Sequence, residues 1–222
     1  MRFPSVSTNR RQMRVLGLAA VALLCAPAAQ AHPHAWIDMK VRLLFDKDGN
    51  LAKLTQEWLF DDFYSAYATQ GVPKDKAGTH DPAKLDALSH ENLKNLAEYD
   101  YFTVVKTELG KVPLAGIGDV STAMVGNRLR MTFTVTLKAP VDGRAGPFVY
   151  SIYDPTYFVE MLHAKGGDSI RLENAPKGCR AEMEGANPDP QIALLAAGLD
   201  KTQSGGDTLG QHFAEKVVIR CD

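Results

Sequence analysis

The sequence of 222 residues lacks the motifs and the charge bias that mark several common functional classes. It contains no nucleophile elbow, no glycine-rich phosphate loop and no His-Glu-x-x-His pair, so it carries no signature of the usual hydrolases, nucleotide-binding enzymes or metalloproteases. Lysine and arginine (25) are slightly outnumbered by aspartate and glutamate (26), which argues against nucleic acid as the main partner. We therefore expect a protein that is not an enzyme and does not bind nucleic acid.

Long apolar runs are equally scarce. The one pronounced apolar segment covers residues 15–28, follows four arginines without an intervening acidic residue, and is shorter than the roughly 20 residues that span a bilayer. It leads into Ala29-Gln30-Ala31, which fits the small-x-small cleavage pattern of exported proteins. The sequence therefore predicts a signal peptide over residues 1–31, cleaved after Ala31. We expect a periplasmic protein without stable membrane insertion.

Cysteine is rare, with three residues in the whole chain. Cleavage after residue 31 would remove Cys25 and leave only Cys179 and Cys221. An even pair in an exported chain predicts a disulfide, since the compartment is oxidising. Such a bond would close a loop of about 40 residues and stabilise the fold by about 4 kcal/mol on the chain-entropy argument. The alternative is two buried free thiols.

Alternation of apolar and polar residues, which is typical of half-buried strands, is abundant. The first alternating stretch begins just after the predicted cleavage site, turns at residues 46–50 and returns over residues 51–60. On its first strand the residues expected to face the core are Ala35, Ile37, Met39, Val41, Leu43 and Phe45. Gly49 or Asn50 supplies the positive φ that the turn needs. The stretch therefore predicts a β-hairpin.

Helical signals follow the hairpin. Asp61 or Asp62 is expected to cap a short helix, because a carboxylate accepts well from the first free amides of a helix. Asp81 followed by Pro82 marks the start of a second helix, since proline is favoured at the first helical position. Together these signals predict a helical insertion over about residues 61–98.

Strand-rich sequence resumes after the insertion. Further strands are expected at residues 101–108, 115–125, 128–138, 148–153, 169–173, 179–184 and 215–221, with one more helix at 190–199. The predicted fold class is mainly β (α+β). We expect a single antiparallel β-sandwich-like domain over residues 32–222, with the helical insertion between its second and third strands.

Several short motifs are shared with a known family. They are the run from His32 to Asp38, the Phe45-Asp46-x-x-Gly49 turn, the residues Trp58, Phe60, Asp61 and Phe63, the phrase from Tyr153 to Phe158, and the C-terminal cysteine. In these motifs and in their order the chain resembles the DUF1007 family. Members of that family are described as uncharacterised periplasmic components of transport systems, often beside nickel/cobalt-type membrane transporters. The resemblance implies a transition-metal role, with an inner-membrane metal transporter as partner.

The predicted cleavage would create an unusual N-terminus. His32 would become the first residue and offer two donors to a metal, its free α-amine and its imidazole. His34 lies on the same strand face, about 6.5–7 Å along the backbone, and adds a third nitrogen. Pro33 removes the amide nitrogen that a square-planar X-X-His site requires. These donors suit copper, nickel, cobalt or zinc. Asp38 on the same face is expected to orient an imidazole. The alternative is a solvated, frayed terminus.

Three more residues are candidate ligands for the same divalent transition metal. Glu160 and His163 have the i, i+3 spacing that brings two side chains to one face of a helix. His212 precedes the C-terminal strand and can contribute an imidazole from there. For each of them an ordinary surface position is the alternative.

Two functional hypotheses follow. In the first, the protein is a periplasmic transition-metal-binding accessory of a nickel/cobalt, zinc or copper transport system that uses the N-terminal histidine site. In the second, it is a docking or scaffolding module of a transporter and uses no metal. A third and weaker alternative is a histidine-brace copper oxidase, which requires an aromatic substrate face around an open copper site.

Overall fold

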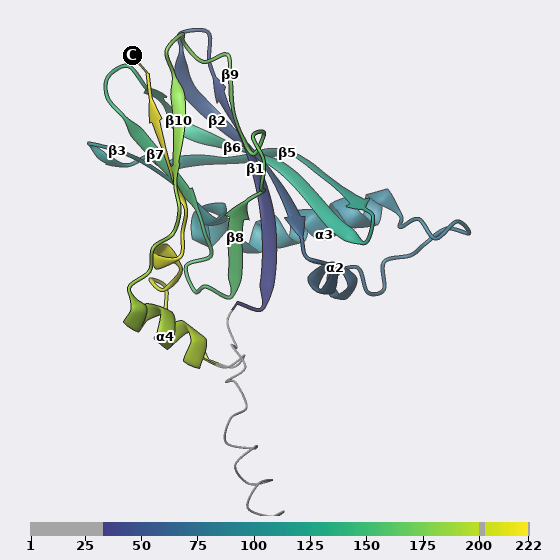
Figure 1. Ribbon diagram of the computed structural model, residues 1–222. Coiled ribbons are helices and arrows are strands. Elements are labelled where there is room, and N and C mark those ends of the chain that lie inside the picture. Colours follow the sequence, from purple (N-terminus) through teal and green to yellow (C-terminus); the bar gives the residue numbers. More distant parts are fainter. Residues whose placement is uncertain (1–32, 200–202, 222) are drawn as a thin grey trace, which may run out of the picture. The chain divides into compact units, whose positions relative to one another are not determined.

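The computed structural model describes residues 33–199 and 203–221, which lie within one compact unit (Figure 1). They form two β-sheets and a few helices, so the expected mainly β fold is confirmed. The six strands of the first sheet run in the order β5-β6-β2-β1-β8, with β9 also paired to β1. They are β1 (Ala35–Phe45), β2 (Asn50–Phe60), β5 (Leu114–Val125), β6 (Arg128–Asp142), β8 (Val159–His163) and β9 (Ile170–Glu173).

The second sheet has five strands in the order β10-β11-β7-β3-β4. They are β3 (Thr103–Thr107), β4 (Gly110–Lys111), β7 (Phe148–Ile152), β10 (Arg180–Glu184) and β11 (Lys216–Arg220). All pairings within this sheet are antiparallel. The buried side chains of both sheets belong to one continuous hydrophobic core.

The alternation predicted for the first strand is confirmed on β1, where all six residues expected to face the core are buried. β1 and β2 pair as an antiparallel hairpin. In the turn, Asp46 Oδ1 accepts from the backbone nitrogens of Asp48 and Asn50, both at 2.9 Å. Gly49 has a φ of 81°, a left-handed conformation that glycine adopts without steric strain. The turn chemistry read from the sequence therefore sets the register of the hairpin.

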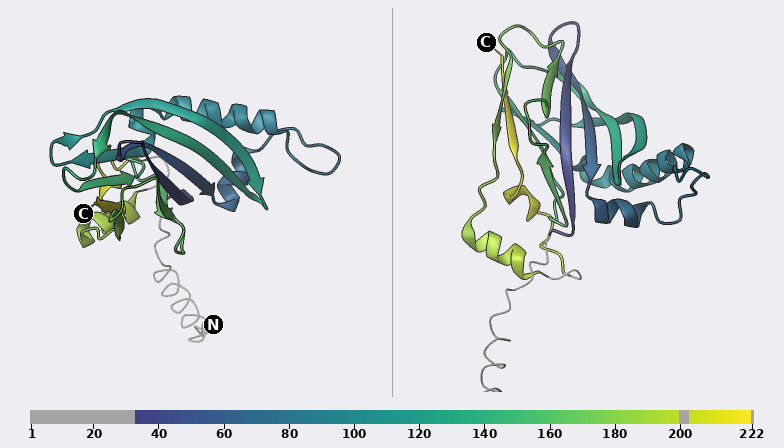
Figure 2. Two further views of the ribbon diagram at one scale, coloured as in Figure 1. Left: turned by 90° about the horizontal axis from the view of Figure 1, so that it is seen from above. Right: turned by 45° about the vertical axis from the view of Figure 1, so that its right-hand side comes forward.

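Helices occupy the chain between β2 and β3: α2 (Asp62–Ala68), α3 (Pro82–Asn95) and the 3-10 helix η1 (Ala97–Phe102). Asp61 caps α2 by accepting from Tyr64 N at 2.8 Å, and the Asp81 carboxylate caps α3. Helix α3 lies against β5 (Figure 2). There the hydroxyl of Thr122 donates to the hydroxyl of Ser89 at 2.7 Å. Both helices thus have an aspartate N-cap, as predicted from the positions of Asp61 and Asp81 in the sequence.

Trp58 is a central side chain of the core. Its ring packs edge-on against Phe133, with centroids 4.9 Å apart, and stacks on Phe102 at 6.1 Å. The indole nitrogen donates to Gln56 Oε1 at 2.9 Å, and Gln56 Nε2 donates to Thr103 Oγ1 at 2.7 Å. These bonds satisfy a fully buried amide and link β2 of one sheet to β3 of the other.

The segment from residue 159 to residue 163 is not a helix, although the i, i+3 spacing of Glu160 and His163 is one that a helix would bring to a single face. It forms strand β8, which pairs in parallel with β1. β9 also pairs in parallel with β1, so the first sheet is mixed rather than antiparallel throughout. Without these two strands one side of β1 would be a free sheet edge, with no neighbouring strand to pair with its backbone donors and acceptors. That long-range requirement overrides the local spacing of Glu160 and His163.

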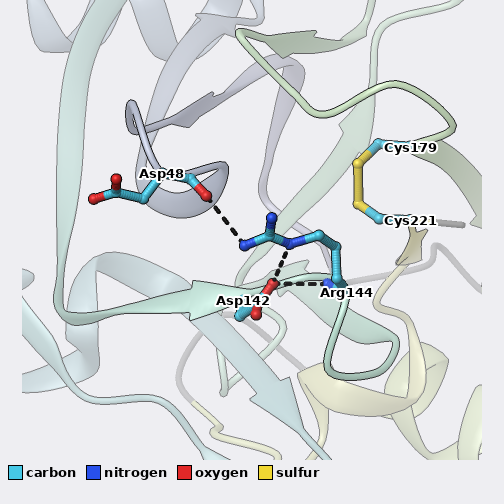
Figure 3. Close-up of a disulfide and its surroundings, with 5 residues drawn as sticks. All are labelled: Asp48, Asp142, Arg144, Cys179 and Cys221. Carbon is cyan, nitrogen blue, oxygen red and sulfur yellow. Dashed lines mark hydrogen bonds and ion pairs between the residues drawn. A yellow bond between two sulfur atoms is a disulfide. The ribbon is translucent and has the colours of Figure 1, made fainter.

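The predicted disulfide between Cys179 and Cys221 is present (Figure 3). It joins the residue before β10 to the residue after β11. Close to it, Arg144 Nε donates to Asp142 Oδ1 at 2.9 Å and Arg144 Nη2 donates to the carbonyl oxygen of Asp48 at 3.1 Å (Figure 3). The loop between β6 and β7 is thereby tied to the β1–β2 turn.

A smaller hydrophobic cluster holds α4 (Pro190–Gly198) and the 3-10 helix η2 (Gly210–His212). Its buried members are Tyr157, Ala196 and Leu209. The rings of Tyr157 and Phe213 stack with centroids 3.8 Å apart. In the part of the chain that the structure describes, no helix has the length and apolar character needed to cross a membrane.

Candidate functional site

His34 lies where the chain enters the first sheet. Its backbone nitrogen donates to the carbonyl oxygen of Phe158 at 2.8 Å, just before β8 begins. Its ring packs against that of Phe158, with centroids 4.7 Å apart. His32 lies outside the described residues, as do the predicted signal peptide and its cleavage site. The described half of the predicted N-terminal site is therefore His34, held at the edge of β1 by the segment that leads into β8.

Glu160 lies beside this position on the neighbouring strand. In the parallel register of β1 and β8, Trp36 is the partner of Glu160. Ala35 and Ile37 face the core, so His34 and Trp36 are on the opposite face, and Glu160 shares that face. The structure thus brings His34 and Glu160 to one side of two adjacent strands. Sequence spacing alone had linked Glu160 to His163 instead.

A tyrosine holds the carboxylate of Glu160. The hydroxyl of Tyr157 donates to Glu160 Oε1 at 3.1 Å. Burial, together with the charge of Glu160 and this hydrogen bond, raises the pKa of Tyr157 well above its usual value. Tyr157 therefore stays protonated at neutral pH, remains a hydrogen-bond donor and limits the rotation of the carboxylate.

Exposed aromatic rings flank the same area. Trp36 is 48% exposed and Phe158 is 44% exposed. The backbone nitrogen of Trp36 donates to Asp61 Oδ2 at 2.9 Å, while Asp61 N donates to the carbonyl oxygen of Trp36 at 2.9 Å. This reciprocal pair joins the start of β1 to the cap of α2, so the aromatic rings project from a well-anchored backbone.

Asp38, expected to orient an imidazole, has an arginine partner. Its Oδ2 lies 2.7 Å from Arg128 Nη2. Arg128 also donates to the carbonyl oxygens of Phe60 at 2.6 Å and Leu59 at 2.8 Å. The structure therefore shows Asp38 as part of the contact between the start of β6 and the end of β2.

His163 points into the core from the other face of β8. Its Nδ1 lies 2.7 Å from Glu215 Oε2, and its Nε2 lies 2.9 Å from the hydroxyl oxygen of Tyr150. The backbone nitrogen of His163 also donates to Glu215 Oε2, at 2.6 Å. Because a carboxylate only accepts, Nδ1 carries a proton, and in the neutral ring Nε2 accepts from Tyr150. Both ring nitrogens are thus occupied by protein partners.

The electrostatics of this buried triad follow from its contacts. Burial by itself would raise the pKa of Glu215, but the hydrogen bonds from the ring and backbone of His163 outweigh it and lower the pKa. Burial and the nearby charge of Glu215 raise the pKa of Tyr150. Sequence reasoning missed Tyr150 and Glu215, because they lie 13 and 52 residues from His163 and no local spacing connects the three.

His212 is the last residue of η2 and lies on a third surface. It lines a cleft on the five-stranded sheet together with Lys106 and Lys216. Cationic neighbours disfavour a metal cation, since like charges repel. The predicted ligands are thus distributed over three environments, and only His34 and Glu160 share a face.

The number of available ligands limits which metal site can form on the face that carries His34 and Glu160. Among residues 33–199 and 203–221, no group of three or more histidine, cysteine, aspartate or glutamate side chains is arranged to hold a metal ion. Transition-metal sites in proteins commonly use three or four protein donors. His34 and Glu160 therefore need donors from outside the described chain, and the amine and imidazole predicted for His32 are the nearest in sequence.

The sequence was compared with known protein families, and the profile described as "Protein of unknown function (DUF1007)" matches residues 17–221. The chain belongs to this family. It is 27% identical over 200 residues to an uncharacterised protein of Haemophilus influenzae, covering 86% of this chain and 92% of that protein. It is 26% identical over 102 residues to an uncharacterised 15.5 kDa protein in the trpE 3' region of Spirochaeta aurantia, covering 46% of this chain and 72% of that protein. The resemblance to the DUF1007 family that the motifs indicated is therefore confirmed.

Proposed function

We propose that this DUF1007 protein is a periplasmic accessory of a transition-metal transport system, and that it binds its metal cargo at the N-terminal histidines. The observation that carries the proposal is the placement of His34 and Glu160 on one face of adjacent strands, at the point where the chain enters the sheet. In the processed protein the amine and imidazole of His32 and the imidazole of His34 would hold the ion. Glu160 would supply a carboxylate from β8.

The donor set suits copper, nickel, cobalt or zinc. Three nitrogens and one carboxylate match the ligands that these divalent ions take in proteins. Pro33 has no amide hydrogen, so the full square-planar X-X-His site cannot form, and the backbone N–H of His34 donates to the carbonyl oxygen of Phe158. The packing of His34 against Phe158 restrains its imidazole plane, which lowers the conformational entropy lost on binding.

The compartment is supported by the disulfide. A bond between Cys179 and Cys221 persists in an oxidising environment and is rare in the cytosol. It agrees with the predicted export signal over residues 1–31 and with a periplasmic location. We propose an inner-membrane metal transporter as the partner that supplies or receives the cargo.

A metal-free docking module is the second candidate, favoured by the exposed aromatic side chains at this end of the fold. Trp36, Phe63, Tyr67 and Phe158 are all exposed. Aromatic residues are enriched at the centres of protein interfaces. In this alternative the same surface contacts a transporter, and the histidines contribute packing rather than metal binding.

Metal titration of the correctly processed protein separates the two. We expect one zinc or copper ion to bind, and a variant with one extra N-terminal residue to bind at least about tenfold more weakly, because its α-amine is lost to a peptide bond. His34→Ala should weaken binding similarly, and Glu160→Gln less. His90→Ala, at an exposed position of α3, is the matched control and should leave the affinity unchanged. Equal affinity with and without the added residue would overturn the N-terminal site, and no specific binding in either form would favour the docking module.

A further inference from the structure

A cleft of about 440 Å³ lies on the five-stranded sheet, away from the face that carries His34. It is bounded by strands β3, β7 and β11 and by the 3-10 helix η2. Val105, Tyr150 and Val217 are fully buried and face the core, so their neighbours in sequence point outward. The floor of the cleft is therefore the outer surface of the sheet.

The polar side chains of the cleft are donors or cations. They are Lys106, Ser151, Tyr153, Gln211, His212 and Lys216. No aspartate or glutamate is among the residues that line it. A protein with 26 acidic residues thus has a concave surface with two lysines and a histidine and without a carboxylate.

The sheet register brings the two lysines to opposite sides of one serine. Ser151 of β7 pairs with Val104 of β3, two residues before Lys106. On the other side Tyr150 pairs with Val217, which puts Lys216 opposite Ser151 in the antiparallel register. Ser151 is 9% exposed and lines the cleft on β7, the strand between the two that carry the lysines.

Neither lysine is neutralised within the cleft. Lys106 and Lys216 form no ion pair with any residue in the ranges 33–199 and 203–221, whereas Lys111, the partner of Lys106 on β4, is bound to Asp100 at 2.6 Å. The acid closest to Lys216 in register is Glu184 on β10, and it neither lines the cleft nor pairs with the lysine. The cleft is therefore bordered by two lysines, and none of its lining residues is a carboxylate.

We propose that this cleft binds a small dianion with carboxylate or phosphate oxygens. Lys106 and Lys216 would supply charge-assisted hydrogen bonds, and Ser151, Tyr153 and His212 would supply further hydrogen bonds. The apolar floor formed by Val104 and Val149 would contact the carbon part of the ligand. The volume lies within the range of small-molecule sites and is too small for a folded partner. This proposal does not depend on the metal site at His34.

Calorimetric titration with inorganic phosphate and with succinate, at constant ionic strength set by sodium chloride, tests the proposal. We expect at least one of the two to bind with a dissociation constant below about 1 mM. Lys106→Met and Lys216→Met should each weaken that binding by about fivefold, since each removes one charged donor. Lys53→Met is the matched control, because Lys53 is exposed on β2 of the other sheet and its loss should change nothing.

The outcomes separate the cleft from general electrostatic attraction. Preference for phosphate or for succinate identifies which oxyanion the cleft takes, and either result supports the site. The proposal would be overturned if neither phosphate nor succinate gave a binding signal in the sodium chloride buffer. It would also be overturned if Lys53→Met weakened binding as much as the variants of the two cleft lysines. The affinity for phosphate should be the same in the His34→Ala variant as in the parent protein, so failure at the N-terminal site leaves this test intact.

Discussion

Glu215 Oε2 lies 2.7 Å from His163 Nδ1 and 2.6 Å from the backbone nitrogen of the same histidine, although 52 residues separate the two. One carboxylate oxygen therefore fixes both the ring and the main chain at the end of β8. Tyr150 of β7 completes the contact through Nε2 of His163. The triad joins the six-stranded sheet to the five-stranded sheet inside the core.

Replacement of Glu215 by glutamine should destabilise the protein by about 1–2 kcal/mol, because a largely buried, charged acceptor of two hydrogen bonds becomes a neutral one. The amide oxygen can take the position of Oε2 and still accept from both donors, but it carries no charge. Urea unfolding of Glu215→Gln against the parent protein measures the change. Glu184→Gln on the exposed strand β10 is the control, and an equal effect in both variants would contradict the role of the triad.

The same carboxylate should make stability depend on pH. Hydrogen bonds from His163 hold the pKa of folded Glu215 below the ordinary value of 4.5, so the folded state favours the ionised form. The resulting stabilisation is present above the unfolded pKa and is lost as the pH falls through the lower folded pKa. The difference in free energy of unfolding between Glu215→Gln and the parent should therefore shrink between pH 5 and pH 3, to about the neutral hydrogen-bond contribution. A difference that grows on acidification would contradict this sign.

The disulfide should contribute about 4 kcal/mol, since it closes a loop of 42 residues in the unfolded chain. The double variant Cys179→Ser/Cys221→Ser removes the bond with little change in volume. Thermal or urea unfolding should show the loss in the variant and in the reduced parent alike. Added reductant should leave the variant unchanged, and a further loss there would mean that reduction acts elsewhere.

Gly210 at the start of η2 has no room for a side chain. A Cβ atom there would overlap the carbonyl oxygen of Asp154 and lie 2.9 Å from its carbonyl carbon. Gly210→Ala should therefore cost about 1–3 kcal/mol or displace η2. Gly167→Ala is the control, because a Cβ atom at that position meets nothing within 4 Å. The free energies of unfolding of the two variants give the comparison, and equal stability would contradict the close approach.

The features of the fold that could be predicted are those that depend on residues close together in the sequence. Alternation set the buried face of β1, and Asp61 and Asp81 marked the helix starts, because a strand face and a cap depend on neighbours a few positions away. β8 could not be predicted in this way. Glu160 and His163 have a spacing compatible with a helix, whereas in the fold the segment pairs as a strand with the edge of β1.

The same distinction between local and long-range signals applies to the residues of the candidate site. The histidines near residue 32 follow from the cleavage pattern alone, and they remain a prediction where the chain lies outside the described residues. The proximity of Glu160 to His34 depends on a parallel pairing between segments more than 120 residues apart. The lysines of the cleft, from β3 and β11, are brought together by β7 between them.

The sequence by itself determined the hairpin and the helix caps, which depend on residue type and short-range order, and also the cysteine pair and membership of the DUF1007 family, which follow from the number of cysteines and the order of motifs. Only the tertiary structure decided that His163 lies in the core with Tyr150 and Glu215, while Glu160 faces the opposite side. The physical reason is that successive side chains of a strand point to opposite faces, so a single change from helix to strand separates two residues that a helix would bring together.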